Sequence, residues 1–179
     1  MKKQILLIAA FTIAAVLPSC EKAAGLLFQP FESPLNFNVA LSSSAAGETK
    51  TLGSTVVSYN LDSEIKTATQ NKFGADFITQ MYINQIAISL TNSTQTNNLS
   101  NFESISLSVS SSGGTPVVLG PFAIPSTATT SHSVAVTNSP NIRPYFNGQN
   151  VTFSIIGKTK TATTITLQAN VGATIKFDK

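Results

Sequence analysis

The chain has 179 residues, of which only 11% are charged, and its formal net charge at pH 7 is +3. It contains one histidine and one cysteine, which excludes multi-histidine metal sites and an internal disulfide. Its lysines are scattered rather than clustered, which argues against nucleic acid as a partner, because such binding requires a basic stripe that faces several phosphates.

Two lysines near the N-terminus precede an apolar run from Ile5 to Leu17, which is the layout of a secretory signal. The run is shorter than the roughly 20 apolar residues that a transmembrane helix requires, so we expect it to be cleaved. It ends in Leu17, Pro18, Ser19 and Cys20. This ending resembles the lipobox of bacterial lipoproteins, and the resemblance implies cleavage before Cys20 and attachment of lipid to that residue. Residues 1–19 are therefore expected to be a lipoprotein signal peptide.

The expected lipid on Cys20 would anchor the mature protein without a membrane-spanning helix. Each buried methylene contributes about 0.8 kcal/mol, so two or three acyl chains together hold a protein on a bilayer. We expect the protein in the cell envelope, on the outer membrane of a Gram-negative bacterium, with exposure to the outside or to the periplasm both open. Residues 20–34 include Pro30 and Pro34 and show no clean hydrophobic period, which is typical of a tether.

Residues 35–179 show repeated alternation of apolar and polar residues, which predicts β-strands with one buried face. The predicted strands are Leu35–Leu41, Thr55–Leu61, Ile86–Leu90, Ile105–Val109, Val117–Leu119, Val134–Val136, Val151–Ile155 and Ile165–Phe177. In the last of them, Gly172 is expected to mark a bulge or a bend. The spacing predicts a single all-β domain, an antiparallel β-sandwich of the immunoglobulin-like or Greek-key type, with a closed barrel as the alternative.

One short helix is expected between the early strands, because Asp62 and Ser63 can cap its start and Gly74 can end it. Residues 112–115 contain two glycines between predicted strands, which indicates a hairpin turn rather than a phosphate loop. Residues 139–148 predict a helical turn that closes an open end of the sheets.

The sequence offers few groups for catalysis. His132 is the only histidine, it lies at the start of a predicted strand, and no G-x-S-x-G motif accompanies it, so we interpret it as a half-buried structural residue. The acidic residues Asp62 and Glu64 are close in sequence, but capping and compensation of the helix dipole explain both. We therefore predict no catalytic residues, no metal ligands and no cofactor, and we do not expect an enzyme.

The most site-like cluster in the sequence is Arg143 with Tyr145 and Phe146, because arginine and aromatic side chains dominate binding hot spots. Packing of the same residues at the end of the sandwich is the alternative interpretation, and we rank it above binding.

The leading functional hypothesis is a non-enzymatic binding module of the cell envelope, which presents loops or a sheet face rich in threonine and asparagine to a glycan or a protein partner. The second is a structural or assembly subunit of a surface fibre or an envelope complex. A hydrolase that uses carboxylates brought together by the fold ranks third. The oligomeric state stays open.

Overall fold

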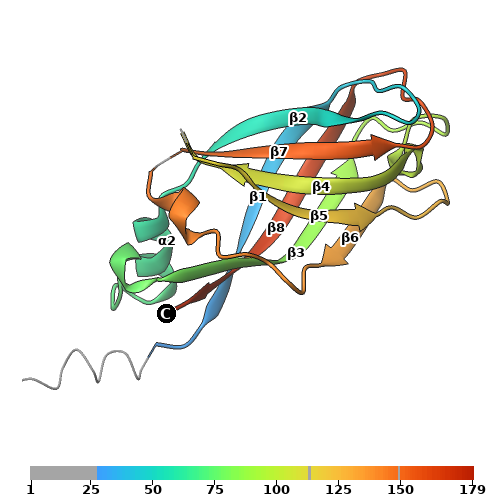
Figure 1. The fold of residues 1–179 in the computed structure, drawn as a ribbon. Coiled ribbons are helices and arrows are strands. Elements are labelled where there is room, and N and C mark those ends of the chain that lie inside the picture. The colour runs from blue at the N-terminus through green and yellow to red at the C-terminus, as the bar shows by residue number, and fades with distance from the viewer. Residues whose placement is uncertain (1–27, 113, 149) are drawn as a thin grey trace, which may run out of the picture.

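The computed structural model describes residues 28–112, 114–148 and 150–179, and it consists of two antiparallel four-stranded sheets packed face to face (Figure 1). The strands are β1 (Phe31–Leu41), β2 (Thr49–Ser58), β3 (Gln80–Leu90), β4 (Phe102–Ser110), β5 (Val117–Ala123), β6 (Ser131–Ala135), β7 (Asn150–Thr159) and β8 (Leu167–Asp178). The helical segments are α2 (Leu61–Ala68) and the short 3-10 helices η1 (Ala75–Phe77), η2 (Leu99–Asn101) and η3 (Arg143–Phe146). The predicted all-β sandwich with one short α-helix between early strands is confirmed.

The strand order makes the sandwich a jelly roll. One sheet runs β1-β8-β3-β6 and the other runs β2-β7-β4-β5. The first and last strands are direct neighbours, since Phe31 lies opposite Phe177 and Leu41 lies opposite Leu167. Eight strands arranged in this way form two Greek keys, so the Greek-key alternative is confirmed and the immunoglobulin-like one is not.

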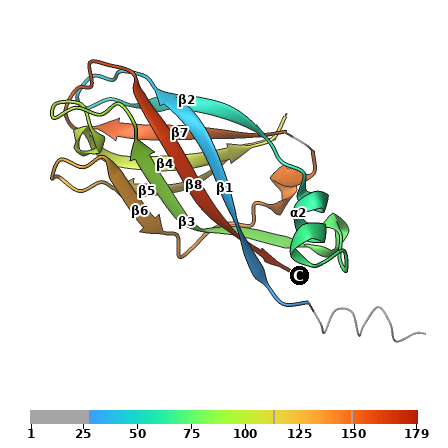
Figure 2. The ribbon, with the colours of Figure 1, turned by 180° about the vertical axis from the view of Figure 1, so that it is seen from behind.

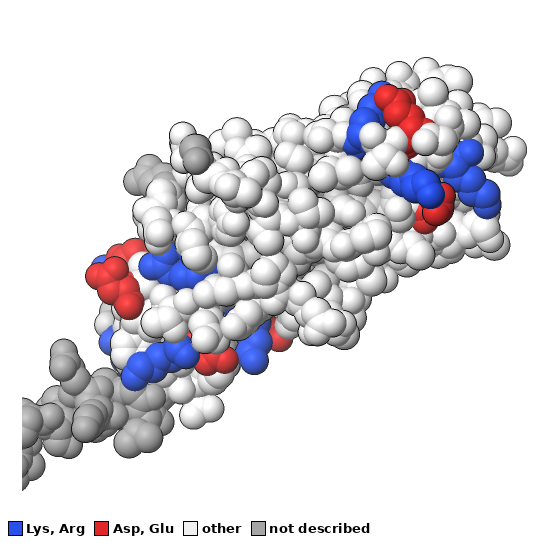
Figure 3. Space-filling view, viewed as in Figure 1, with Lys and Arg blue, Asp and Glu red and all other residues white. Residues whose placement is uncertain are grey.

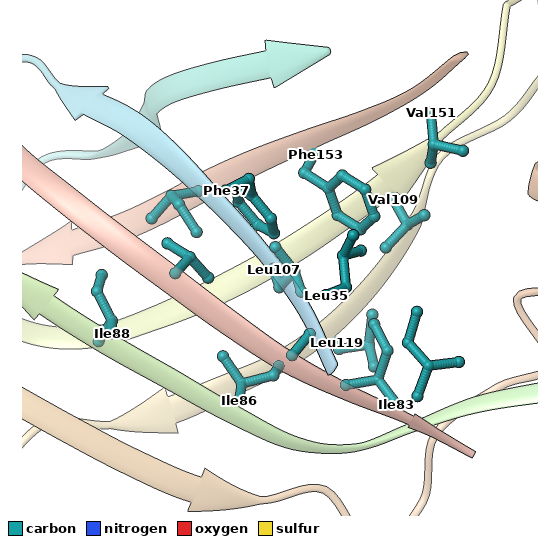
Figure 4. Packing of buried hydrophobic residues seen from close by; sticks show 14 of the residues in the cluster. Leu35, Phe37, Ile83, Ile86, Ile88, Leu107, Val109, Leu119, Val151 and Phe153 are labelled. Atoms are coloured by element: carbon teal, nitrogen blue, oxygen red, sulfur yellow. The ribbon is translucent and has the colours of Figure 1, made fainter. Parts of the chain in front are cut away.

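The core lies between the two sheets and is filled by the inward-facing residues of each strand (Figure 4). Phe37 from β1 stacks on Phe153 from β7 at a ring-centroid distance of 4.8 Å and thereby joins one sheet to the other. Ile86 and Ile88 from β3 approach the same core, as the period of two predicts. Full burial of each such side chain stabilises the fold by about 1.5–3 kcal/mol.

The folded domain begins earlier than predicted. Strand β1 starts at Phe31 rather than at Leu35, and Phe28 before it is already buried. The predicted boundary between the tether and the domain, after residue 34, therefore falls inside β1. Pro34 and Glu32 point outward on an edge strand, where proline is tolerated, and this is why the segment does not look like a strand. Cys20 and the predicted signal peptide lie outside the described residues.

Helix α2 starts and ends at residues other than those predicted. Asn60 caps it, because its side-chain oxygen accepts a hydrogen bond from the backbone N–H of Ser63 at 3.0 Å. The helix ends at Ala68, and Gln70 and Asn71 then adopt positive φ angles. The prediction that Asp62 caps the helix and Gly74 ends it is therefore wrong.

Gly172 does not mark a bulge. It pairs in register with Asn36 of β1 and with Ala87 of β3, and the irregularity in this sheet lies instead in β3, between Ile83 and Gln85.

The hairpin prediction is confirmed, since β4 and β5 are antiparallel neighbours joined through the glycine-containing segment. The predicted helical turn is also present as η3. Within the described part of the chain, no helix is long and apolar enough to cross a membrane.

Candidate functional site

The cluster predicted from the sequence, Arg143 with Tyr145 and Phe146, lies on η3 and beside the α2 end of the sandwich. The guanidinium of Arg143 donates to the backbone carbonyls of Ile78 at 3.0 Å and Ala75 at 3.3 Å, and also to the side chain of Asn147. The two bonds to backbone carbonyls tie η3 to the η1 segment, and the bond to Asn147 is local. They favour the alternative interpretation, in which the arginine holds the end of the sandwich together.

The two aromatic residues of this cluster are engaged as well. Phe146 is buried and packs edge-to-face on Tyr59 at 5.2 Å. The hydroxyl of Tyr145 donates to the carbonyl of Thr115 at 3.0 Å. A cavity of about 290 Å³ adjoins the cluster. The contacts of these three residues within the protein already explain the positions of their side chains. Binding of a ligand by them stays a prediction.

Contacts within the domain shift the pKa values of two ionisable groups at this cavity, Asp62 and Tyr59. Lys66 bonds to Asp62 at 2.6 Å, and this contact, together with the backbone N–H of Ala75, lowers the pKa of the Asp62 carboxyl. Burial, with a smaller effect from the negative charge of Glu64, raises the pKa of the Tyr59 hydroxyl. His132 is half-buried on β6 and lines the outer-face groove described below rather than this cavity, and its interpretation as a structural residue stays a prediction. Among the residues that the structure describes, no three His, Cys, Asp or Glu side chains gather to hold a metal ion.

A more extensive hollow lies on the outer face of the β1-β8-β3-β6 sheet, the face turned toward the viewer in Figure 2. It is a groove with a volume of about 770 Å³. The outward-facing residues that line it are Asn36, Asn38, Ala87, Ser89, Ser131, Ser133, Asn170 and Gly172. We call this set the polar groove, and we regard it as the candidate site.

Strand register assembles the polar groove from two rows that cross all four strands. One row consists of Asn38, Asn170, Ser89 and Ser131, and the next consists of Asn36, Gly172, Ala87 and Ser133. Neighbouring strands are about 4.8 Å apart, and residues on one face repeat about every 6.8 Å along a strand. A row therefore spans about 14 Å, which is long enough to contact more than one sugar ring or several residues of a peptide.

Small side chains make this face concave. Gly172 has no side chain, and Ala87 and Ser89 beside it on β3 are short. A smaller hollow of about 220 Å³ shares Asn36, Ala87 and Gly172 with the groove and continues it along the sheet. Gly172 thus leaves space on the outer face, where even a Cβ atom would stand 3.0 Å from the Asn36 side-chain oxygen.

The amide groups of the polar groove are available to a ligand. Asn36, Asn38 and Asn170 are exposed, and none of the side-chain hydrogen bonds found among the described residues engages their amides. Each amide has two N–H donors and a carbonyl acceptor. Asn38 and Asn170 are paired directly across neighbouring strands, which places two such groups side by side.

The polar groove contains no charged side chain. Charged residues of the domain gather instead at the two ends of the sandwich, and a broad uncharged band separates these ends on the opposite sheet as well (Figure 3). A ligand that depends on ion pairs would find no partner in the groove. The groove is suited to a ligand that is itself polar and uncharged.

No known family matches the chain, and no curated protein matches its sequence. Among solved structures, the fold is similar to a chain of the infectious bursal disease virus Gx strain, with 13% identity, a TM-score of 0.40, and 83% of this chain and 32% of that chain covered. A chain of Sulfolobus Turreted Icosahedral Virus gives 9% identity, a TM-score of 0.39, and 82% and 39% covered. A chain from Bacillus endospore appendages, described as disulfide-linked pili, gives 12% identity, a TM-score of 0.26, and 83% and 88% covered.

The chain spans about a third of the length of the two viral chains. These likenesses carry no argument about function, which has to come from the polar groove and the N-terminal sequence.

Proposed function

We propose that the protein is a lipid-anchored, non-enzymatic binding module of the bacterial cell envelope, and that its polar groove binds an uncharged glycan. The observation that carries this proposal is the groove itself, with three asparagine amides that have no side-chain hydrogen bond among the described residues, a floor of small residues and no lysine, arginine, aspartate or glutamate in its lining. Sites for small ligands are concave and contain a few well-placed polar groups, and the groove has both properties.

The chemistry of the groove favours a neutral sugar over a protein partner. Sugar hydroxyls both donate and accept hydrogen bonds, and so do asparagine amides. Protein partners are usually held by arginine and aromatic hot spots, and the outward-facing residues of the groove include neither. The expected affinity is weak, with a dissociation constant of about 1 mM for one site, and several anchored copies on one surface would raise it through avidity.

The anchoring part of the proposal relies on the lipobox-like ending at Cys20. On this proposal the module sits on the outer membrane of a Gram-negative bacterium and holds the groove toward glycans of the envelope. Protease treatment of intact cells, followed by detection of the domain, would tell surface exposure from a periplasmic orientation. A Cys20→Ser variant is expected to lose its membrane attachment, and continued attachment would contradict the lipid anchor.

Glycan binding is tested with the mature domain carrying Cys20→Ser, screened against neutral and anionic oligosaccharides and then measured by titration calorimetry. We expect binding to neutral oligosaccharides that changes little between low and high salt, because no ion pair forms. The double variant Asn38→Ala and Asn170→Ala is expected to weaken binding at least tenfold. The matched control is Asn138→Ala, which changes an exposed asparagine outside the groove and should leave binding unchanged. Binding restricted to anionic glycans, or equal binding by all variants, would contradict the proposal.

An assembly role is the second candidate, and the outer face of the β2-β7-β4-β5 sheet favours it. This face carries mainly serine and threonine, and Val56 and Val118 on its two edge strands are 63% and 49% exposed. Interfaces between proteins are depleted in charge, as this face is. If copies associate through it, light scattering will show a mass that grows with concentration, and the pair Val56→Lys and Val118→Lys will restore the monomer. A monomer at every concentration would exclude this role.

A further inference from the structure

Four phenylalanines form a cluster at the α2 end of the sandwich. Phe28, Phe31, Phe73 and Phe77 are its members, and we call this set the phenylalanine cluster. Phe28 is the buried centre, with ring-centroid distances of 5.5 Å to Phe73 and 5.4 Å to Phe77. The other three are only half-buried, so the cluster reaches the surface.

The described chain both begins and ends at this place. Phe28 is the first described residue, β1 leads away from it, and β8 returns to it (Figures 1 and 2). At the C-terminal end of β8, the amine of Lys179 lies 4.8 Å from the ring centre of Phe77. The cluster therefore marks the end of the sandwich from which the chain continues toward Cys20.

The chain between Cys20 and this cluster is short. Only seven residues separate Cys20 from Phe28. Even a fully extended chain of that length spans no more than about 28 Å. If lipid holds Cys20 in the bilayer, the phenylalanine cluster stays within that distance of the membrane surface, whereas the tether places no such limit on the loops at the other end of the sandwich.

The charges around the cluster do not oppose contact with lipid. Lys66 pairs with Asp62 at 2.6 Å, and Lys176 lies 3.8 Å from Asp178. Lysines and carboxylates are thus mixed at this end, as Figure 3 shows for one side of it. Contact with a membrane would depend on the aromatic side chains, which favour the boundary between headgroups and acyl chains, and little on anionic lipids.

We propose that the α2 end of the sandwich docks on the lipid surface through the phenylalanine cluster. This inference rests on the lipid anchor of the proposed function and does not depend on the ligand of the groove. A short tether gives the docking surface an effective concentration in the millimolar range, so a contact that would be too weak for free protein is sufficient. The lipid surface is thus the occupant of an apolar patch that the fold leaves half-covered.

Docking in this orientation sets the distance between the polar groove and the membrane surface. Phe37, in the middle of β1, is six residues from Phe31, which corresponds to about 20 Å along the strand. The groove would then open to the side, clear of the headgroups. A glycan lying parallel to the membrane could reach it.

Tryptophan fluorescence provides a direct test, since the chain contains no tryptophan. The lipidated mature protein is placed in phosphatidylcholine vesicles that carry bromine atoms on the acyl chains close to the headgroups, where they quench nearby tryptophan. Phe77→Trp is the first reporter, and Asp76→Trp, at an exposed neighbouring position, serves if the first variant folds poorly. Ile165→Trp, in the loop at the opposite end, is the control.

We expect a loss of fluorescence at positions 77 and 76, no loss at position 165, and little dependence on salt. If the protein floats with the vesicles but neither reporter is quenched, the anchor stands and the docking is wrong. If the protein does not float with the vesicles, both the anchor and the docking are wrong. Quenching that requires anionic lipid would also overturn the proposed aromatic contact.

Discussion

Replacing Asn101 with alanine is expected to lower the free energy of unfolding by about 3 kcal/mol, because buried groups that lose their partner cost about 1–3 kcal/mol each. Asn101 is 4% exposed. Its side-chain oxygen accepts the backbone N–H of Asn98 at 2.9 Å, and its amide donates to the carbonyls of Thr96 at 3.0 Å and Ala162 at 3.1 Å. One side chain thus links the loop before β4 to the loop between β7 and β8.

Urea denaturation and thermal melting measure this effect, and for a domain of this size the melting temperature should fall by about 6–12 °C. Asn138→Ala is again the control. It removes an exposed asparagine with no side-chain hydrogen bond among the described residues, and it should change the free energy of unfolding by no more than about 0.5 kcal/mol. A loss below about 1 kcal/mol for Asn101→Ala would mean that this network does not stabilise the loops.

The alternation of apolar and polar residues was sufficient to predict the sandwich, because each strand has one face in a shared core. In β1, Leu35, Phe37 and Val39 are buried as predicted. The predicted ends of the strands were less accurate where an apolar residue does not reach the core. Ile165 keeps the parity of β8, yet it is 36% exposed, and the strand begins only at Leu167.

The candidate site was predicted only in part. The sequence indicates a polar sheet face rich in threonine and asparagine, since Asn36, Asn38 and Asn170 take the outward parity of their strands. It does not say which strands are neighbours. Asn38 and Asn170 are 132 residues apart in the chain and directly opposite in the sheet, and only the jelly-roll order brings them together. Asparagine is disfavoured in strands, and its recurrence at outward positions is the local signal of the groove.

The same limit applies to two single residues. Gly172 looks like a bulge when β8 is considered alone, because glycine weakens a strand. The space that it leaves on the outer face is recognised only once Asn36 and Ala87 are known to lie on its two sides. The sequence alone left both a binding role and a packing role open for Arg143, because only the fold places the carbonyls of Ile78 and Ala75 beside its guanidinium.

Filling the floor of the polar groove should abolish binding of the proposed glycan. In a Gly172→Leu variant, the new side chain would project from the centre of the second row into the space between Asn36 and Ala87. We expect no binding detectable by titration calorimetry with the neutral oligosaccharide that the wild-type domain binds, which means a loss of affinity of at least about tenfold, or about 1.4 kcal/mol. Stability should change little, since the position faces solvent on the outer face of the sheet.

Gly148→Leu is the matched control for this experiment, because a Cβ atom at Gly148 meets nothing within 4 Å and the residue is exposed beside η3, away from the groove. It should bind like the wild type. If both variants melt normally and Gly172→Leu still binds, the ligand lies elsewhere, and the asparagine rows are a solvated face with no ligand. If Gly172→Leu loses binding while Gly148→Leu keeps it, the absence of a side chain at position 172 is what makes the sheet a binding surface.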